Sequence, residues 1–178
     1  MIEALISSKT RIKLLLKFFL NSSNKAYLRG LEEEFGESSN AIRLELNKLE
    51  QVGMITSDVQ GNKKYFTANK KHPLFFDLNS IIRKYVGIDT IILNIINQLG
   101  QVEKVYLIGE FAKGLDNNVI DLEFIGIVNT NYLADLITKA EPLVKRKIRY
   151  VVYSQDEYAG LNKKQDDYEK LLIWSKEA

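Results

Sequence analysis

Polar and cationic side chains gather at two places in the N-terminal part of the sequence, and their types suit contacts with nucleic acid. The first place is the segment 38–47, and the second is the dipeptide 63–64. Serine and lysine side chains bind phosphate oxygens, whereas asparagine and arginine match the hydrogen-bonding edges of bases. We predict a surface for double-stranded DNA made of Ser38, Ser39, Asn40, Arg43, Asn47, Lys63 and Lys64, with Arg11 as a further phosphate contact.

A second group of side chains, in the C-terminal part, could bind a metal ion. Asp121 and Glu123 stand two positions apart in an apolar run, so on a strand they would face the same side. With Glu110 they could build a magnesium site. The alternative, which we favour, is that these carboxylates form a solvated edge or an interface face.

Three helices and a β-hairpin are predicted to position the first group. Apolar residues recur every three or four positions in three successive segments, and a glycine follows the second and the third. Two short extended segments then enclose a glycine and an asparagine that suit a hairpin tip. The helices are expected at 9–20, 27–35 and 38–52, and the strands at 54–58 and 63–68. This order is that of a winged helix-turn-helix, to which we assign residues 1–70.

Residues 73–99 continue with helical periodicity and carry more aliphatic side chains than one amphipathic face usually shows. The surplus lies between Ile88 and Leu99, and it must pack on the next domain, on another subunit, or on both. We assign residues 71–100 to a helical linker that also serves dimerisation.

Beyond Gly100 the periodicity changes to strands alternating with helices, which indicates a small α/β unit. Strands are expected at 105–108, 120–128 and 148–153, and helices at 132–140 and 164–174. We assign residues 101–178 to this domain, so the whole chain is predicted to be of the α+β class.

Composition narrows the function further. The 178 residues are 46% hydrophobic and 27% charged, with a net charge of +2 and no cysteine, which excludes disulfides and thiolate chemistry. The single histidine, His72, precedes a proline and is interpreted as a turn residue. Residues 1–70 hold 11 Lys and Arg against 8 Asp and Glu, whereas residues 101–178 hold 11 against 13, so an anionic partner should meet the N-terminal part. We find no signal peptide or membrane segment and expect a cytoplasmic protein without a cofactor.

Several stretches resemble the ArsR-like winged-helix transcriptional regulators. They are Ser8-Lys9-Thr10-Arg11-Ile12-Lys13-Leu14-Leu15, Tyr27-Leu28-Arg29-Gly30-Leu31, Leu46-Asn47-Lys48-Leu49-Glu50-Gln51-Val52-Gly53-Met54-Ile55 and Gly61-Asn62-Lys63-Lys64-Tyr65-Phe66. The sequence is similar to the subgroup fused to a nucleotidyltransferase-like domain, in which His72-Pro73-Leu74-Phe75 matches the usual link. The resemblance covers nearly the whole chain.

The nucleotidyltransferase motif is only partly present. Gly109, Phe111, Ala112 and Gly114 match it, Lys113 takes its basic position, and Asp121 matches its second metal-binding aspartate. Glu110 replaces the phosphate-facing serine, Val119 replaces the first aspartate, and Arg149 stands where a later carboxylate is expected. The resemblance therefore implies a retained fold without catalysis, with Gly109, Glu110, Lys113, Asp121 and Glu123 as a remnant of a nucleotide or metal site.

Together these observations predict a sequence-specific DNA-binding transcriptional regulator, not an enzyme. It would be a homodimer, with a C-terminal domain for dimerisation or for sensing a small-molecule or nucleotide effector. Two alternatives remain open: a magnesium-dependent nucleotidyltransferase that uses Asp121 and Glu123, and a winged helix that contacts a protein partner instead of DNA.

Overall fold

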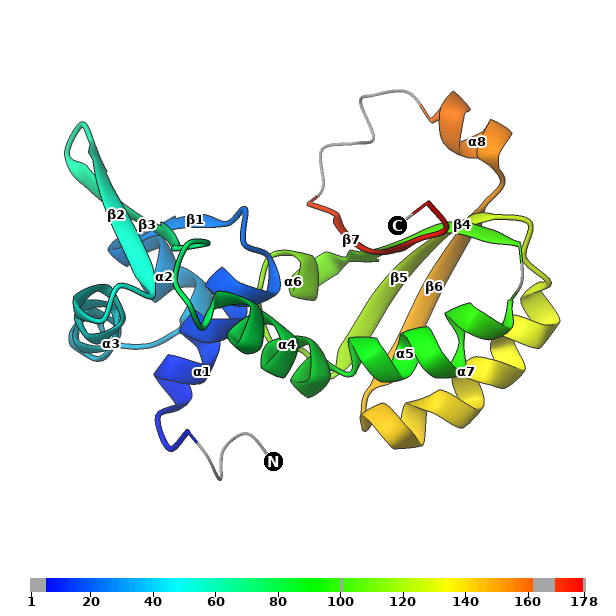
Figure 1. Ribbon diagram of the computed structural model, residues 1–178, viewed down its shortest axis with the longest axis horizontal. Helices are drawn as coiled ribbons and strands as arrows, with labels where there is room; N and C mark the ends of the chain where they lie inside the picture. Colours follow the sequence, from blue (N-terminus) through cyan, green and yellow to red (C-terminus); the bar gives the residue numbers. More distant parts are fainter. Residues whose placement is uncertain (1–5, 100, 162–168, 178) are drawn as a thin grey trace. The chain divides into compact units, whose positions relative to one another are not determined.

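The computed structural model describes residues 6–99, 101–161 and 169–177 as a mixed α+β protein with two sheets (Figure 1). Contacts divide the chain into two compact units. The first unit comprises Met1–Tyr85 and Gly114–Asp116, and the second comprises Val86–Lys113 and Asn117–Ala178. Residues 71–100 are thus shared between the units, and the three-part division made from the sequence stays a prediction.

The first unit begins with the expected helix. Helix α1, Lys9–Leu15, starts where the Ser8 side chain accepts a hydrogen bond from the Arg11 amide, and it continues as a π-helical turn, η2, Leu16–Leu20. Most of its apolar side chains are fully buried. This helix therefore forms the centre of the first unit's core.

The second and third helices also lie where the sequence places them. Helix α2, Leu28–Phe35, ends at Gly36, whose φ of 63° is the left-handed cap that glycine adopts without strain. Helix α3, Ser39–Gln51, starts where the Ser38 hydroxyl accepts a hydrogen bond from the Ala41 amide. Its buried stripe includes Ile42, Leu46 and Leu49.

The hairpin is present, and a third strand completes its sheet. Strands β2, Ile55–Gln60, and β3, Lys63–Ala68, are antiparallel, and the turn between them is Gly61-Asn62. Strand β1, Lys25–Tyr27, pairs antiparallel with β3, so the sheet order is β1-β3-β2. The sequence did not predict β1, because three residues carry too little periodicity.

The helical segment that follows is interrupted by Gly87, whose φ is 98°. Helix α4, Phe75–Val86, precedes it, and helix α5, Ile88–Asn94, and a 3₁₀ turn, η3, Ile96–Gln98, follow. Within the second unit α5 packs beside α7 (Figure 1), and its Ile88 and Ile91 side chains are fully buried. Packing on the next domain therefore accounts for much of the aliphatic surplus.

The second unit is a four-stranded sheet in the order β6-β5-β4-β7, covered on one face by α5 and α7 (Figure 1). Strands β5 and β6 are parallel, and the other neighbours are antiparallel. The elements are β4, Val102–Ile108; α6, Gly109–Ala112; β5, Val119–Gly126; α7, Thr130–Val144; β6, Lys147–Tyr153; α8, Gln155–Gly160; and β7, Leu171–Ser175.

The predicted C-terminal helix at 164–174 is wrong where the structure describes it. Residues 171–175 form β7, which pairs with the edge of β4, and residues 164–168 lie outside the described residues. A short apolar run such as Leu171–Trp174 fits a strand as well as a helix, and here pairing with β4 decides the outcome. Among the described residues, no helix combines the length and hydrophobicity needed to cross a membrane.

Candidate functional site

The exposed face of α3 carries most of the polar residues predicted to contact DNA. Asn40, Arg43 and Asn47 follow one another at spacings of three and four, so they share a side of the helix, and all three are exposed. The side chains of Ile42 and Leu49 are buried behind them. Core packing thus turns the three polar side chains outward on a rigid element.

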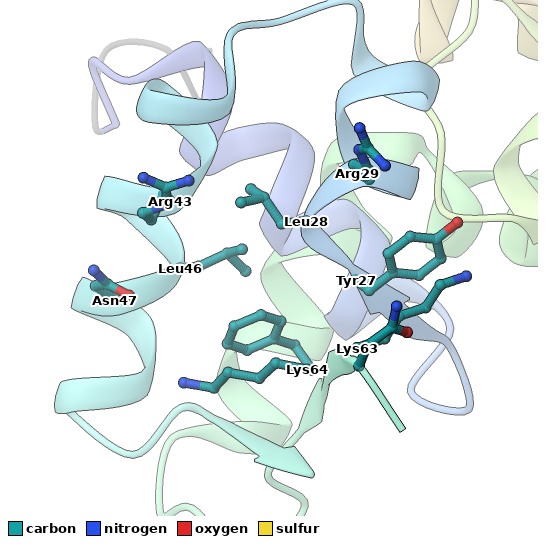
Figure 2. Close-up of a pocket in the computed structure, with 10 residues that line it drawn as sticks. Tyr27, Leu28, Arg29, Arg43, Leu46, Asn47, Lys63 and Lys64 are labelled. Atoms are coloured by element: carbon teal, nitrogen blue, oxygen red, sulfur yellow. The ribbon is translucent and has the colours of Figure 1, made fainter. Parts of the chain in front are cut away.

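A groove of about 400 Å³ opens between α3, the start of α2 and strand β3 (Figure 2). Cationic and amide side chains line it together with an apolar set, and Figure 2 shows that they come from all three elements. The lining residues are Tyr27, Leu28, Arg29, Arg43, Leu46, Asn47, Asn62, Lys63, Lys64 and Phe66. The groove therefore brings together four of the predicted residues: Arg43, Asn47, Lys63 and Lys64.

The two arginines of the groove are available for a ligand. Within the described part of the chain, neither the Arg29 nor the Arg43 guanidinium forms an ion pair or a side-chain hydrogen bond. The Lys63 ammonium lies 4.2 Å from the centroid of the Tyr27 ring. Such an exposed cation–π contact is worth only about 0.5–1 kcal/mol, so it leaves the ammonium free to meet an anion.

Lys64 differs, because its ammonium already has a partner. Its Nζ donates to Oε2 of Glu50 over 2.7 Å, and the Ser57 hydroxyl also donates to that carboxylate. These hydrogen bonds hold the pKa of Glu50 below its usual value. Lys64 therefore brings less positive charge to the groove than its sequence position implies.

Arg29 is a groove residue that the sequence analysis did not select. It lies two positions after Tyr27, in the first turn of α2, and Tyr27 is paired in register with Tyr65 of β3. The two tyrosine rings meet edge to face, with centroids 5.4 Å apart. This pairing joins segments that are distant in the sequence, so no local sequence pattern predicts that Arg29 lies beside the hairpin.

The remaining predicted DNA contacts lie outside the groove lining. Ser38, Ser39 and Asn40 stand at the start of α3, where the Ser38 oxygen caps the helix. Arg11 donates through Nε to Oε2 of Glu45 over 2.8 Å. Burial alone would raise the pKa of Glu45, but the hydrogen bond and charge of Arg11 outweigh it and lower that pKa. Arg11 thus faces a carboxylate, and its phosphate contact stays a prediction.

The three carboxylates that were predicted as a possible metal site, Glu110, Asp121 and Glu123, are each paired with a cation. Gly109, directly after β4, has a φ of 68°. A Cβ at this position would lie 2.7 Å from Oδ2 of Asp121, so the backbone passes close to the carboxylate. Asp121 accepts two hydrogen bonds from Arg149, at 2.6 and 3.0 Å. Asp121 and Arg149 lie opposite each other on parallel strands, and the pKa of Arg149 is raised by this hydrogen-bonded pair. In the next turn Lys113 lies 3.0 Å from Glu110.

Glu123 is buried, so of the two placements expected from the sequence, a solvated edge or an interface face, the solvated edge is wrong for this residue. Its side chain has no exposed surface, and Oε1 accepts a hydrogen bond from Nζ of Lys170 over 2.9 Å. The same ammonium lies 4.9 Å from the centroid of the Tyr158 ring. Burial is the main cause that raises the pKa of Tyr158. Among the described residues, no group of three or more acidic or histidine side chains is arranged to hold a metal ion.

Comparisons with known proteins give two distant structural likenesses. No family model and no curated protein matches the sequence. Reduced HlyU from Vibrio cholerae covers 47% of this chain and 79% of its own, with 14% identity and a TM-score of 0.36. A protein from Sulfolobus solfataricus described as a candidate nucleotidyltransferase covers 53% of this chain and 83% of its own, with 20% identity and a TM-score of 0.37. These likenesses are too distant to assign a family or a function.

Proposed function

We propose that this chain is a cytoplasmic, sequence-specific DNA-binding transcriptional regulator with an N-terminal winged helix-turn-helix of the ArsR-like type. The observation that carries the proposal is the groove beside α3, where the guanidinium groups of Arg29 and Arg43 have no partner among the described residues. Unpaired arginines on the rim of a concave surface favour a polyanionic partner, since phosphate and base acceptors would satisfy their donors.

Each element has a distinct part in the proposed contact. Helix α3 enters the major groove, where Asn40, Arg43 and Asn47 meet base edges. Arg29 and Lys63 lie across the groove from it (Figure 2) and bind the sugar-phosphate backbone, which fixes the register of the helix on the duplex. Two copies of the chain would present two such helices to half-sites about one helical turn, ~34 Å, apart, which is why we propose a homodimer.

For the second unit we propose a nucleotidyltransferase-like domain that senses an effector or supports dimerisation and does not transfer nucleotides. Asp121 already receives its counter-charge from Arg149, and Glu123 from Lys170. Val119 cannot contribute a ligand, and so a magnesium ion would find few carboxylate oxygens to replace its water shell. The small-molecule or nucleotide effector would bind without metal-dependent turnover.

A gel-shift assay with genomic fragments tests the DNA-binding proposal. We expect the unaltered chain to shift a subset of fragments, and Arg43→Ala to weaken binding about tenfold or more, as loss of a base contact does. Lys63→Ala with Lys64→Ala should weaken binding to all fragments alike. Lys84→Ala removes an exposed charge on α4, outside the groove, and should change nothing. Equal binding by all four proteins would refute the assigned surface.

A further inference from the structure

We propose that the groove between α2, α3 and β3 also binds a small amphipathic organic anion, and that this anion and DNA exclude each other. The ligand class is an aromatic or branched aliphatic group that carries one carboxylate, sulfonate or phosphate. The inference rests on the proposed DNA-binding function and adds to it a means of regulation at the same surface.

The floor of the groove is apolar, which a duplex backbone does not require. Leu46 and Phe66 line the groove and are 1% and 5% exposed. Leu28 projects into the groove from the start of α2 (Figure 2). The groove volume, about 400 Å³, falls within the range of roughly 300–1,000 Å³ common for small-molecule sites. A flat apolar group seated in the groove would leave water itself and cover the half-buried Leu28 side chain, whereas a phosphodiester lying on the rim would do neither.

The rim selects the charge of the occupant. Among the residues that the structure describes, the Arg29 and Arg43 guanidinium groups have no partner, and the Lys63 ammonium contacts the face of the Tyr27 ring. One anionic group can therefore be bound by a planar guanidinium while its apolar part covers Leu28 and Phe66. A neutral molecule of the same shape lacks the contact with the guanidinium. An inorganic anion, or an anion that carries only a methyl group, lacks the apolar contact.

Exclusion follows from the shared donors. Any anion seated in the groove occupies the guanidinium groups that the proposed complex uses for DNA, so bound ligand lowers the apparent DNA affinity by mass action. The effect is greatest when the ligand concentration exceeds its dissociation constant.

The test compares three probes at constant ionic strength by fluorescence anisotropy of a labelled genomic fragment. Naphthalenesulfonate has both features, methanesulfonate has only the anion, and naphthol has only the aromatic ring. We expect naphthalenesulfonate to displace DNA at a concentration about tenfold or more below that of either other probe, because it alone makes both contacts. Equal effects of naphthalenesulfonate and methanesulfonate would overturn the proposal.

Two leucine variants locate the ligand. Leu28→Ser removes part of the floor while serine remains compatible with the first turn of a helix, and Leu74→Ser removes an exposed leucine outside the groove. We expect Leu28→Ser to weaken naphthalenesulfonate binding about tenfold, measured by calorimetry without DNA, and Leu74→Ser to leave it unchanged. Equal behaviour of the two variants would place the probe elsewhere and overturn the proposal.

Calorimetric titration of naphthalenesulfonate without DNA separates this inference from the proposed function. DNA binding without a saturable probe site would overturn the inference and leave the DNA-binding proposal intact. Suppose instead that the protein binds no DNA but binds one naphthalenesulfonate per chain, and that Leu28→Ser loses this binding. That result would support the ligand site and refute the DNA-binding proposal.

Discussion

Replacing Lys170 by methionine should destabilise the second unit strongly. The Glu123 carboxylate has no exposed surface, the Lys170 side chain is 12% exposed, and their charged atoms are 2.9 Å apart. Removing one partner of a buried ion pair typically costs about 3–5 kcal/mol. Total stabilities of domains are about 5–15 kcal/mol, so the loss is a large fraction of the whole.

The chain provides its own probe for this measurement. Its single tryptophan, Trp174, lies in β7 opposite Val105 of β4, so its fluorescence in a urea titration reports unfolding of the second unit. The matched control replaces both partners, Glu123→Leu with Lys170→Met, and should be within about 1 kcal/mol of the unaltered chain or more stable. A loss below about 1 kcal/mol for Lys170→Met alone would show that the carboxylate is hydrated and would refute the reasoning.

One glutamate variant and a pair of glycine variants test the first unit. Glu50→Gln releases Lys64 and removes a negative charge beside the groove, so DNA affinity should rise and the salt dependence should steepen by about one counterion. Because the folded-state pKa of Glu50 is lowered, its ion pair stabilises the fold above the unfolded pKa of about 4.3, and this stability disappears as pH falls through the folded pKa. Unfolding followed by circular dichroism should therefore show Glu50→Gln to be less stable than the unaltered chain near neutral pH and equally stable in acid. Gly36 and Gly114 both have a positive φ, and Gly36→Ala is expected to lower the free energy of unfolding by about 1–2 kcal/mol. Gly114→Ala should lower it more, because a Cβ there would lie 2.6 Å from Cα of Lys17, whereas a Cβ at Gly36 would meet no atom within 4 Å. Equal thermal unfolding of these two glycine variants would contradict that argument.

Local signals in the sequence predicted the helices of the first unit well. Ser38 and Gly36 mark their ends because a serine cap and a left-handed glycine act within a few residues of their own position. The same type of signal stands at Ser154 and Glu157, which form a capping box at the start of α8, and this signal was missed.

Contacts between distant segments could not be predicted in this way. Arg29 reaches the groove because β1 pairs with β3, and Glu123 is buried because Lys170, forty-seven residues later, neutralises it. β7 forms because β4 offers an unpaired edge, which outweighs the helical spacing of its side chains. Partners of this kind depend on topology, whereas periodicity describes only one segment at a time.

The salt dependence of DNA binding tests the central claim most directly. The unaltered chain, the double variant Arg29→Ala with Arg43→Ala, and the control Lys84→Ala should be compared by anisotropy on one selected fragment over a range of salt concentrations. The account predicts that the double variant binds more weakly and that its plot of log affinity against log salt is shallower by about one to two counterions. An unchanged slope and affinity in the double variant, or an equal loss in Lys84→Ala, would contradict it.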